Sequence, residues 1–283
     1  MIDLHTHTTA SDGRCTPQAL VEQAAAASVD VLSVTDHDTV GACAAAAAAC
    51  AERNIEFVSG IEITAISDGT DVHVLGYFID VRSEKLQAFL SDQRRSRIAR
   101  VRQIAERLTA LGLELDADAI LRPGLDDPSR AVGRPWVARA LVEAGYVATI
   151  GDAFDRWLSP GRPAFVPRSG ATPEQVFARI HEASGIASLA HPALLTRDDW
   201  IGGFARSGLD ALEVYHSEHD ATATERYLML ARELDLAISG GSDFHGDGSH
   251  GPDGPGSVSL PRDAFERLKQ AARKRRGPSG RPL

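Results

Sequence analysis

The first residues that could do chemistry are two histidines separated by one residue. His5 and His7 directly follow a short apolar run, and Asp12 comes five residues later. Alternate residues of an extended segment point to the same side, so both imidazoles can reach one cation. A single histidine in such a position is more often structural, but a pair followed by a carboxylate indicates metal ligands. We therefore expect His5, His7 and Asp12 to bind metal.

Further histidines and carboxylates follow or interrupt other apolar runs. Burying an ionised Glu62 between Ile61 and Ile63 is costly unless a cation or a full set of hydrogen bonds compensates its charge. His73, taken alone, fits a hydrogen-bonded core histidine better than a ligand. The complete set of expected metal ligands is His5, His7, Asp12, His37, Glu62, His73, His191, Asp243 and His245.

This set of donors predicts a cluster of cations. Nine nitrogen and oxygen donors without a cysteine exceed what one ion requires, so we expect two or three divalent ions. Mixed imidazole and carboxylate ligands suit Mn²⁺ first, with Zn²⁺ or Fe²⁺ as alternatives, whereas Ca²⁺ prefers oxygens alone. Clustered cations lower the pKa of a bound water and hold the oxygens of a phosphoryl group. Hydrolysis of a phosphoester by metal-bound hydroxide is therefore the predicted chemistry.

Short strands and helices that alternate along the chain must position these side chains. Such alternation favours a parallel sheet or a barrel, in which the loops at the carboxyl ends of the strands converge on one face. Asp68-Gly69 between two apolar runs instead predicts a hairpin within Glu62–Tyr77, and Thr16 before Pro17 predicts a helix N-cap. The expected strands are Ile2–Leu4, Val31–Thr35, Glu56–Thr64, Val72–Ile79, Ile186–Ala190, Ala211–Tyr215 and Leu236–Ser239, and the expected helices are Pro17–Ala27, Val40–Arg53, Pro173–Ser184 and Glu218–Leu234.

Residues 83–168 interrupt this alternation, because they contain no convincing strand and show helical periodicity. We expect a helical insertion domain that contributes to substrate binding, within a discontinuous barrel formed by residues 1–82 and 169–283. Two further insertion helices are expected over Pro135–Glu143 and Ile150–Leu158, and the C-terminal tail from about residue 275 is expected to be disordered. The apolar positions of the first insertion helix are Ile98, Val101, Ile104, Leu108 and Leu111.

The composition excludes several classes of protein. Of 283 residues, 43% are hydrophobic and 24% are charged, as in an ordinary globular chain. The net charge of −9 argues against a protein that coats duplex nucleic acid, and the five arginines within 94–102 are typical of a solvated helix face. No apolar run approaches the roughly 20 residues of a membrane helix, and the three cysteines fit no disulfide framework. We expect a cytoplasmic protein with no membrane partner.

The nine expected ligands resemble the motif set of the PHP (polymerase and histidinol phosphatase) family. The resemblance implies an α/β fold, a distorted (β/α)7 barrel, around a trinuclear site in which His191, Asp243 and His245 are catalytic. The motifs read here His5-x-His7, Asp12, Thr35-Asp36-His37-Asp38, Glu62, His73, His191-Pro192 and Gly241-Ser242-Asp243-Phe244-His245. The implied ligands are His5, His7, Glu62 and Asp243 for one cation, Glu62, His73 and His191 for a second, and Asp12, His37 and His245 for a third.

The insertion resembles one branch of that family. Val74-Leu75-Gly76-Tyr77-Phe78, an arginine-rich helix and Gly133-Arg134-Pro135 are similar to the branch that removes the 3′-phosphate from nucleoside 3′,5′-bisphosphates. The resemblance implies a phosphatase that releases nucleoside 5′-phosphate and orthophosphate from substrates such as adenosine 3′,5′-bisphosphate. Some members also trim short RNA from its 5′ end, so short single-stranded RNA is a second expected partner. Trp136 stands where relatives often have a histidine.

A bisphosphate substrate requires cationic side chains that hold one phosphate away from the metals. Arginine suits this task because its guanidinium binds phosphate with two parallel hydrogen bonds. Arg134 is the first candidate, since it lies next to an expected helix N-terminus. Ser11 and Arg14, near Asp12 in the sequence, and His216 and His219, after another expected strand, are the other expected substrate contacts.

Three alternatives remain open from the sequence. Two are enzymes: a histidinol-phosphate phosphatase and a 5′–3′ exonuclease acting on short RNA. The third is a non-catalytic module whose metal site only stabilises the fold or supports a polymerase partner. Degenerate modules tend to lose ligands, whereas every expected ligand position is occupied here, which favours an enzyme.

Overall fold

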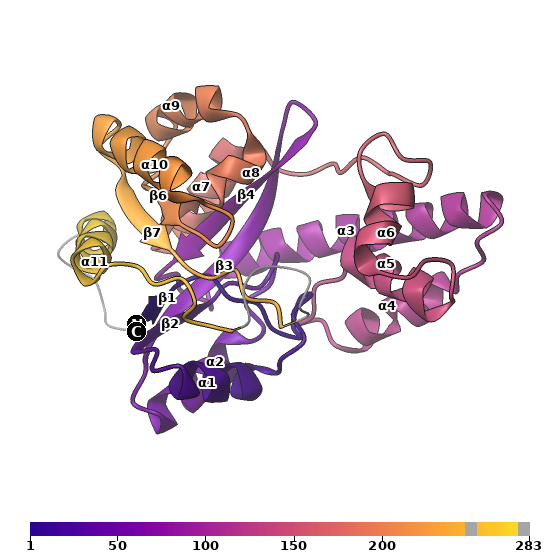
Figure 1. Cartoon of the computed structure of the whole chain (residues 1–283), viewed down its shortest axis with the longest axis horizontal. Helices are drawn as coiled ribbons and strands as arrows, with labels where there is room; N and C mark the ends of the chain where they lie inside the picture. Colours follow the sequence, from indigo (N-terminus) through magenta and orange to yellow (C-terminus); the bar gives the residue numbers. More distant parts are fainter. Residues whose placement is uncertain (247–253, 277–283) are drawn as a thin grey trace.

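The computed structural model describes residues 1–246 and 254–276, and all seven expected strands are present within them. They are β1 (Ile2–Asp3), β2 (Val31–Val34), β3 (Glu56–Ser67), β4 (Thr70–Tyr77), β5 (Ile186–Leu189), β6 (Ala211–Tyr215) and β7 (Ala237–Gly240). The strands form one sheet in the order in which they occur in the chain (Figure 1). β1 to β3 are parallel, β4 is antiparallel to both β3 and β5, and β5 to β7 are parallel again.

The sheet curls into a nearly closed barrel because the segments that follow β1 and β7 meet. The Asp243 amide donates to the His5 carbonyl (2.8 Å), and Thr6 pairs with Phe244 in a parallel bridge. The expected α/β barrel of seven strands is therefore confirmed, with a distortion where β4 runs in the opposite direction. Closure also places the first histidines of the chain beside a motif more than 230 residues later.

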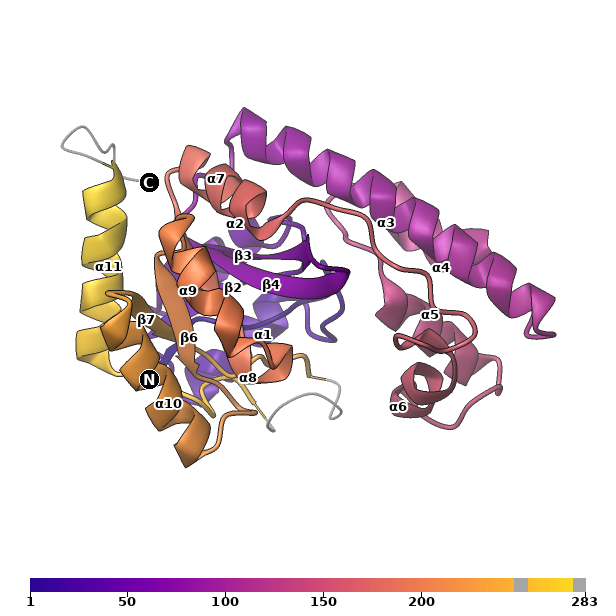
Figure 2. The ribbon, with the colours of Figure 1, turned by 90° about the horizontal axis from the view of Figure 1, so that it is seen from above.

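The expected hairpin joins β3 to β4 and accounts for the reversed strand. Ser67 pairs with Thr70 at its tip, and the intervening Asp68 (φ 47°) and Gly69 (φ 76°) adopt the left-handed backbone that a tight hairpin turn requires. β3 has 12 residues, whereas β2 and β5 have four each. The hairpin therefore extends past the neighbouring strands, and its tip points toward the insertion (Figure 2).

Helices surround the barrel and close one of its ends. The expected helices correspond to α1 (Pro17–Ala26), α2 (Cys43–Glu52), α7 (Pro173–Glu182) and α10 (Ala221–Glu233). The Thr16 side chain accepts a hydrogen bond from the Ala19 amide, as expected of an N-cap. Four helices were not expected from the sequence: α4 (Ala117–Asp126) in the insertion, and α8 (Pro192–Leu195), α9 (Asp198–Arg206) and α11 (Arg262–Arg276) around the barrel.

Helix α11 covers the barrel end farthest from the insertion (Figure 2). Its buried Phe265 and Leu268 pack with Leu4 and Tyr77 in one hydrophobic cluster. The helix ends at Arg276, close to residue 275, from about which the tail was expected to be disordered. The rest of that expected tail, residues 277–283, lies outside the described residues.

The insertion is helical, as expected, and lies to one side of the barrel (Figures 1 and 2). It contains α3 (Glu84–Ala110), α4 (Ala117–Asp126), α5 (Arg134–Glu143) and α6 (Ile150–Ala153), which continues into a π-helical turn at Phe154–Leu158. Buried Val101, Ile104 and Leu108 of α3 pack against the other insertion helices in a cluster formed by insertion residues alone. Leu111, expected on the same face, instead caps α3 and is 45% exposed.

Across the described part of the chain, every helix is too short or too polar to cross a lipid bilayer.

Candidate metal centre and adjoining arginine cavity

All nine expected ligands converge at the end of the barrel where the parallel strands finish. The rings of His7 and His245 stack with centroids 4.1 Å apart, and those of His37 and His73 lie 5.1 Å apart. The convergence follows from the topology, because the carboxyl ends of parallel strands meet at one edge. His5, His7 and Asp12 follow β1, His37 follows β2, Glu62 and His73 lie in the hairpin, His191 follows β5, and Asp243 and His245 follow β7.

Glu62 lies at the centre of this cluster with only 1% of its side chain exposed. Its Oε1 lies 2.8 Å from His73 Nδ1 and 3.2 Å from His191 Nε2. Its Oε2 lies 3.0 Å from His37 Nδ1 and 3.3 Å from His7 Nε2. The two oxygens of one carboxylate therefore face different imidazoles, an arrangement that suits a ligand bridging two cations.

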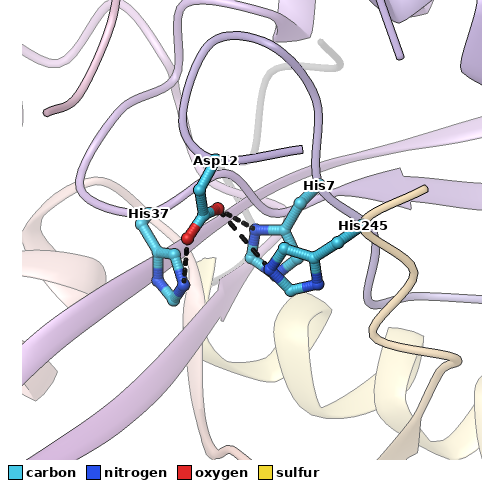
Figure 3. Close-up of side chains that lie close together, drawn as sticks. All are labelled: His7, Asp12, His37 and His245. Carbon is cyan, nitrogen blue, oxygen red and sulfur yellow. Dashed lines mark ion pairs between the residues drawn. The ribbon is translucent and has the colours of Figure 1, made fainter. Parts of the chain in front are cut away.

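Asp12 forms a second group with His7, His37 and His245, which we call the Asp12 group (Figure 3). Asp12 Oδ2 lies 3.6 Å from His37 Nε2, and Asp12 Oδ1 lies 3.5 Å from His245 Nε2 and 3.9 Å from His7 Nδ1. These separations exceed direct hydrogen bonds, and one cation between the four side chains would contact all of them.

Asp243 and His5 lie together with His216, which the sequence placed among the substrate contacts. Asp243 Oδ1 lies 3.2 Å from His5 Nε2, and Asp243 Oδ2 lies 3.4 Å from His216 Nε2. Ligand atoms of these three residues lie within 4.8 Å of one another. His216 is therefore part of the cluster itself, and its chemistry allows it to contact a cation as well as a substrate.

Several buried nitrogen and oxygen atoms of the cluster, each able to bind a metal ion, have no hydrogen-bond partner among the described residues. His7 Nε2, for example, lies 3.0 Å from Asp243 Oδ1 without forming a hydrogen bond. A buried polar atom left unpaired costs about 1–3 kcal/mol, and a divalent cation would satisfy these nitrogens and oxygens together. The residues therefore fit a divalent-metal centre. The unpaired atoms are His5 Nε2, both ring nitrogens of His7, Asp12 Oδ1, His37 Nδ1 and Glu62 Oε2.

Burial and neighbouring charges set the protonation of the cluster in the metal-free chain. Burial works to raise the pKa of Glu62, but neighbours led by His37 lower that pKa well below its usual value. Burial and the neighbouring His245 lower the pKa of His7 to about 4. Burial works to lower the pKa of His245, but Asp243 and Asp12 raise it to about 10. His7 is thus neutral and ready to ligate at pH 7, whereas His245 must release a proton to do so.

A buried carboxylate behind the cluster orients two of its histidines. Glu213 Oε1 lies 2.9 Å from His5 Nδ1, and Glu213 Oε2 accepts a hydrogen bond from the His191 amide (2.7 Å). His191 (φ 25°) and Asp243 (φ 57°) have left-handed backbones, which cost on the order of 1–3 kcal/mol each. Such strain persists only where surrounding interactions hold the backbone in place. At His191, the hydrogen bond from its amide to Glu213 is one of these interactions.

An arginine cavity of about 130 Å³ adjoins the cluster on the insertion side. Arg97 and Arg100 reach it from α3, Arg134 from α5, and Arg168 from the segment that returns to the barrel. A second cavity, of about 210 Å³, lies directly over the metal ligands. The residues that line both cavities are Asp12, His37, His73, Pro135 and Phe154.

The charges of the arginine cavity favour an anion. Asp38 Oδ2 lies 2.5 Å from Arg97 Nη2 and 3.5 Å from Arg168 Nη2, and Asp71 Oδ2 lies 3.2 Å from Arg134 Nη2. Burial lowers the pKa of Arg168 to about 9, so that it stays protonated at pH 7. Four guanidinium groups against the three carboxylates of Asp12, Asp38 and Asp71 leave a net positive charge, and clustered arginines bind phosphate through paired hydrogen bonds.

This cavity corrects the expectation that the arginines of 94–102 form a solvated helix face. Arg97 and Arg100 turn into the cavity, whereas Arg95 is exposed and pairs with Asp92. The helical periodicity of the sequence already indicated that these two arginines face inward, because Arg97 and Arg100 lie on the same side of the helix as the buried Val101.

The structure separates the expected substrate contacts. The Ser11 hydroxyl is buried and donates to Asp36 (2.6 Å), and the His219 Nδ1–H donates to Val214 O (2.8 Å). Arg14 is exposed and lines a different groove, beside α4 and α5. Of the expected substrate contacts, those at the cluster or in the arginine cavity are His216 and Arg134.

Sequence reasoning missed two kinds of residue at this site. Glu213 lies between Leu212 and Val214 in a buried strand, so the burial argument used for Glu62 applies to it as well. Arg168 carries no comparable signal, because nothing in its local sequence shows that the chain returns from the insertion to the cavity there.

Comparisons with known proteins agree with this geometry. Residues 3–119 match the model of the PHP domain. A 3′,5′-nucleoside bisphosphate phosphatase of Chromobacterium violaceum is 35% identical over 92% of this chain and 92% of its own length. The 5′-3′ exoribonuclease Rnm of Salmonella typhimurium is 36% identical over 86% of this chain and 84% of its own length.

A solved structure agrees as well. It is that of a candidate metal-dependent phosphoesterase from Bifidobacterium adolescentis, which superposes with a TM-score of 0.87 and 31% identity over 95% of each chain. The matched domain, the near full-length relatives and the shared barrel lead to one conclusion: this chain belongs to the PHP family.

Proposed function

We propose that this chain is a metal-dependent phosphatase that hydrolyses the 3′-phosphate of nucleoside 3′,5′-bisphosphates, such as adenosine 3′,5′-bisphosphate. The observation that carries the proposal is the arginine cavity beside the metal cluster, with five lining residues shared between the two cavities. A substrate with two phosphates fits one phosphate among the arginines and the other over the metal ligands. The phosphatase of Chromobacterium violaceum, similar over nearly its whole length, supports this assignment.

The metal ligands in this proposal are the nine expected residues, with His216 as a neighbour of Asp243. Mixed nitrogen and oxygen donors favour Mn²⁺, with Zn²⁺ or Fe²⁺ as alternatives. Bound divalent cations would lower the pKa of water and stabilise charge on the phosphoryl oxygens. Among the ligands, we propose from the resemblance to the PHP family that His191, Asp243 and His245 are catalytic, and all three border the cavity in which the phosphate would react.

The chain's own residues hold the substrate. The four arginines bind the 5′-phosphate, which directs the 3′ side of the ribose toward the cluster. In the reaction, a water oxygen bonds to phosphorus, the bond between phosphorus and O3′ breaks, and O3′ takes up a proton. The products are nucleoside 5′-phosphate and orthophosphate. In this scheme residues 83–168 form a substrate-binding domain, and residues 1–82 with 169–283 form the catalytic barrel.

Histidinol phosphate fits this site less well. It carries one phosphate and a cationic amine, so binding its phosphate at the metals would place a positive charge near four guanidinium groups. A purely stabilising metal module is also disfavoured, because such a module has no need of an anion cavity next to its metal.

Short single-stranded RNA is a second candidate substrate, and a specific groove favours it. A groove of about 520 Å³ is lined by Arg14, Arg130 and Arg139, and Arg139 also lines the cavity over the metal ligands. In an oligonucleotide, the nucleotides beyond the scissile phosphate would leave the metal cavity on this side. The similarity to exoribonuclease Rnm supports this candidate.

We also propose that the protein is located in the cytoplasm. The three cysteines are free, which suits a reducing cytoplasm.

The test is hydrolysis by metal-loaded protein, measured as phosphate release from adenosine 3′,5′-bisphosphate and from histidinol phosphate, and as mononucleotide release from a 5′-phosphorylated RNA trimer. We expect the bisphosphate to be turned over with the highest kcat/KM. No phosphate release from it would refute the proposal, whereas preferred cleavage of the trimer would favour the second candidate. Asp243→Ala should abolish turnover in a chain that remains folded, whereas a purely stabilising metal predicts unfolding.

A further inference from the structure

The loop that carries Asp12 is held by a row of hydrogen bonds from the insertion. Four consecutive carbonyls, those of residues 9–12, each accept one bond. The donors, in the same order, are Arg130 Nε (3.0 Å), the Ala131 amide (2.7 Å), Trp136 Nε1 (3.0 Å) and Arg139 Nη2 (2.6 Å). These donors lie between residues 130 and 139, more than 110 positions away in the sequence. The insertion thus contacts the backbone of a proposed metal ligand directly.

The barrel holds the opposite side of the same loop. Asp36 accepts hydrogen bonds from the Thr8 amide (2.7 Å), the Thr8 hydroxyl (2.7 Å) and the Ser11 hydroxyl (2.6 Å). A Cβ on Gly13 would lie 2.6 Å from the His7 carbonyl carbon, so the loop folds back closely onto the segment that follows β1. The Asp12 backbone is therefore placed between two structural units that meet at this loop.

Trp136 is the buried aromatic donor of the row. Its side chain is 8% exposed, and the Arg130 guanidinium lies 5.0 Å from its ring centroid. The next residues of α5, Val137 and Ala138, are fully buried in the insertion core. The indole N–H donates to the Ser11 carbonyl, on the peptide bond that joins Ser11 to Asp12. A displacement of α5 would therefore move Asp12.

We propose that Trp136 is a positioning residue for Asp12, through which the insertion completes the cation site of the Asp12 group. This inference rests on the proposed function. The other carboxylates of the cluster have different supports: Glu62 lies within β3, and the backbone of Asp243 is bonded to His5. Loss of the Trp136 bond should therefore affect one cation and spare those held by Glu62 and Asp243. The insertion then has two tasks, binding the substrate and building part of the metal centre.

The test is Trp136→Phe, which removes the indole N–H and keeps an aromatic ring. Trp157→Phe is the matched control, because Trp157 belongs to the same insertion core and its indole N–H has no hydrogen-bond partner among the described residues. Mn²⁺ binding to metal-free protein is measured by calorimetric titration, and the number of bound ions by elemental analysis. Thermal unfolding of the metal-free variants reports any general structural damage.

We expect wild type and Trp157→Phe to bind the same number of ions with the same affinities. Trp136→Phe should bind one ion about tenfold more weakly and the others unchanged, since losing a hydrogen bond that orients a metal ligand weakens metal binding about 10- to 100-fold. Unchanged binding of all ions, or equal weakening of all, would overturn the inference. Arg130→Gln, which removes the bond to the Thr9 carbonyl, should weaken the same ion and provides the test if Trp136→Phe does not fold.

Failure of the proposed function would be recognised separately. Wild-type protein that binds several ions but releases no phosphate from adenosine 3′,5′-bisphosphate would refute the proposed function, while the selective effect of Trp136→Phe on one ion would still support the positioning role.

Discussion

Replacing Arg134 by glutamine should reduce turnover of a bisphosphate and spare a monophosphate. Arg134 contributes one of four guanidinium groups to the arginine cavity. Losing one hydrogen bond to a charged group costs about 1.5–3 kcal/mol, which corresponds to about a 10- to 150-fold fall in kcat/KM. A nucleoside 3′-monophosphate has no phosphate to place in the cavity, so its kcat/KM should change by less than about threefold.

The assay is phosphate release from adenosine 3′,5′-bisphosphate and from adenosine 3′-monophosphate, by metal-loaded wild type and Arg134→Gln at the same ionic strength. Arg95→Gln is the control, since Arg95 is 69% exposed on the outer face of α3 and should leave both substrates unaffected. An equal fall for both substrates would show that Arg134 supports the fold or the metals instead of the remote phosphate. No fall with the bisphosphate would remove Arg134 from the substrate site.

Three further outcomes are expected. Glu213→Gln should weaken Mn²⁺ binding about 10- to 100-fold in a calorimetric titration, because His5 loses its orienting carboxylate. Glu233→Gln, on the exposed face of α10, should leave the affinity unchanged, and equal affinities of the two variants would contradict the role of Glu213. Chelation of bound Mn²⁺ should lower the Tm, by loss of about 2.7 kcal/mol if the metal was present at 100 times its Kd, and an unchanged Tm would argue against a bound metal. Asp210→Asn should lower the free energy of unfolding in urea by about 2 kcal/mol at pH 7, because hydrogen bonds led by that from His181 hold the pKa of Asp210 below its ordinary value against the effect of burial. The stabilisation that accompanies a depressed carboxyl pKa is present above about pH 4 and is lost as the pH falls through the pKa of the folded state. The difference in unfolding free energy from wild type should therefore shrink toward pH 3, and a constant difference would refute this cause.

The strands and the metal cluster could be predicted because both leave local signals. Buried strands appear as short apolar runs, and an ionisable residue inside such a run, as at Glu62, requires compensation that only a cation or a complete set of hydrogen bonds provides. The arginine cavity depends on long-range geometry instead. Arg97 and Arg168 are 71 residues apart and meet only because both pair with Asp38.

Other omissions have a different cause. Helix α11 was missed because its sequence, with a run of basic residues from Arg273 to Arg276, suggests an exposed tail, and its apolar side is apparent only once the barrel is present to cover it. Trp136 was noted as a departure from its relatives, but its function depends on the position of the Ser11 carbonyl, 125 residues away.

The β3–β4 hairpin determines how far apart two anionic groups of a ligand can lie. Glu62 and His73 lie at the metal cluster, while Thr64, which pairs with His73, and Asp71, nearer the hairpin tip, line the arginine cavity. One antiparallel ladder thus spans both charge-binding regions with a fixed spacing. Each residue of a strand advances by about 3.3 Å and successive side chains face opposite sides, so two residue pairs inserted between the levels of His73 and Asp71 would keep the side chains on the same face and move Asp71 about 6.6 Å farther from the metal cluster. Hairpin length is therefore a means by which homologous barrels could select ligands of different size without any change in the metal-binding side chains.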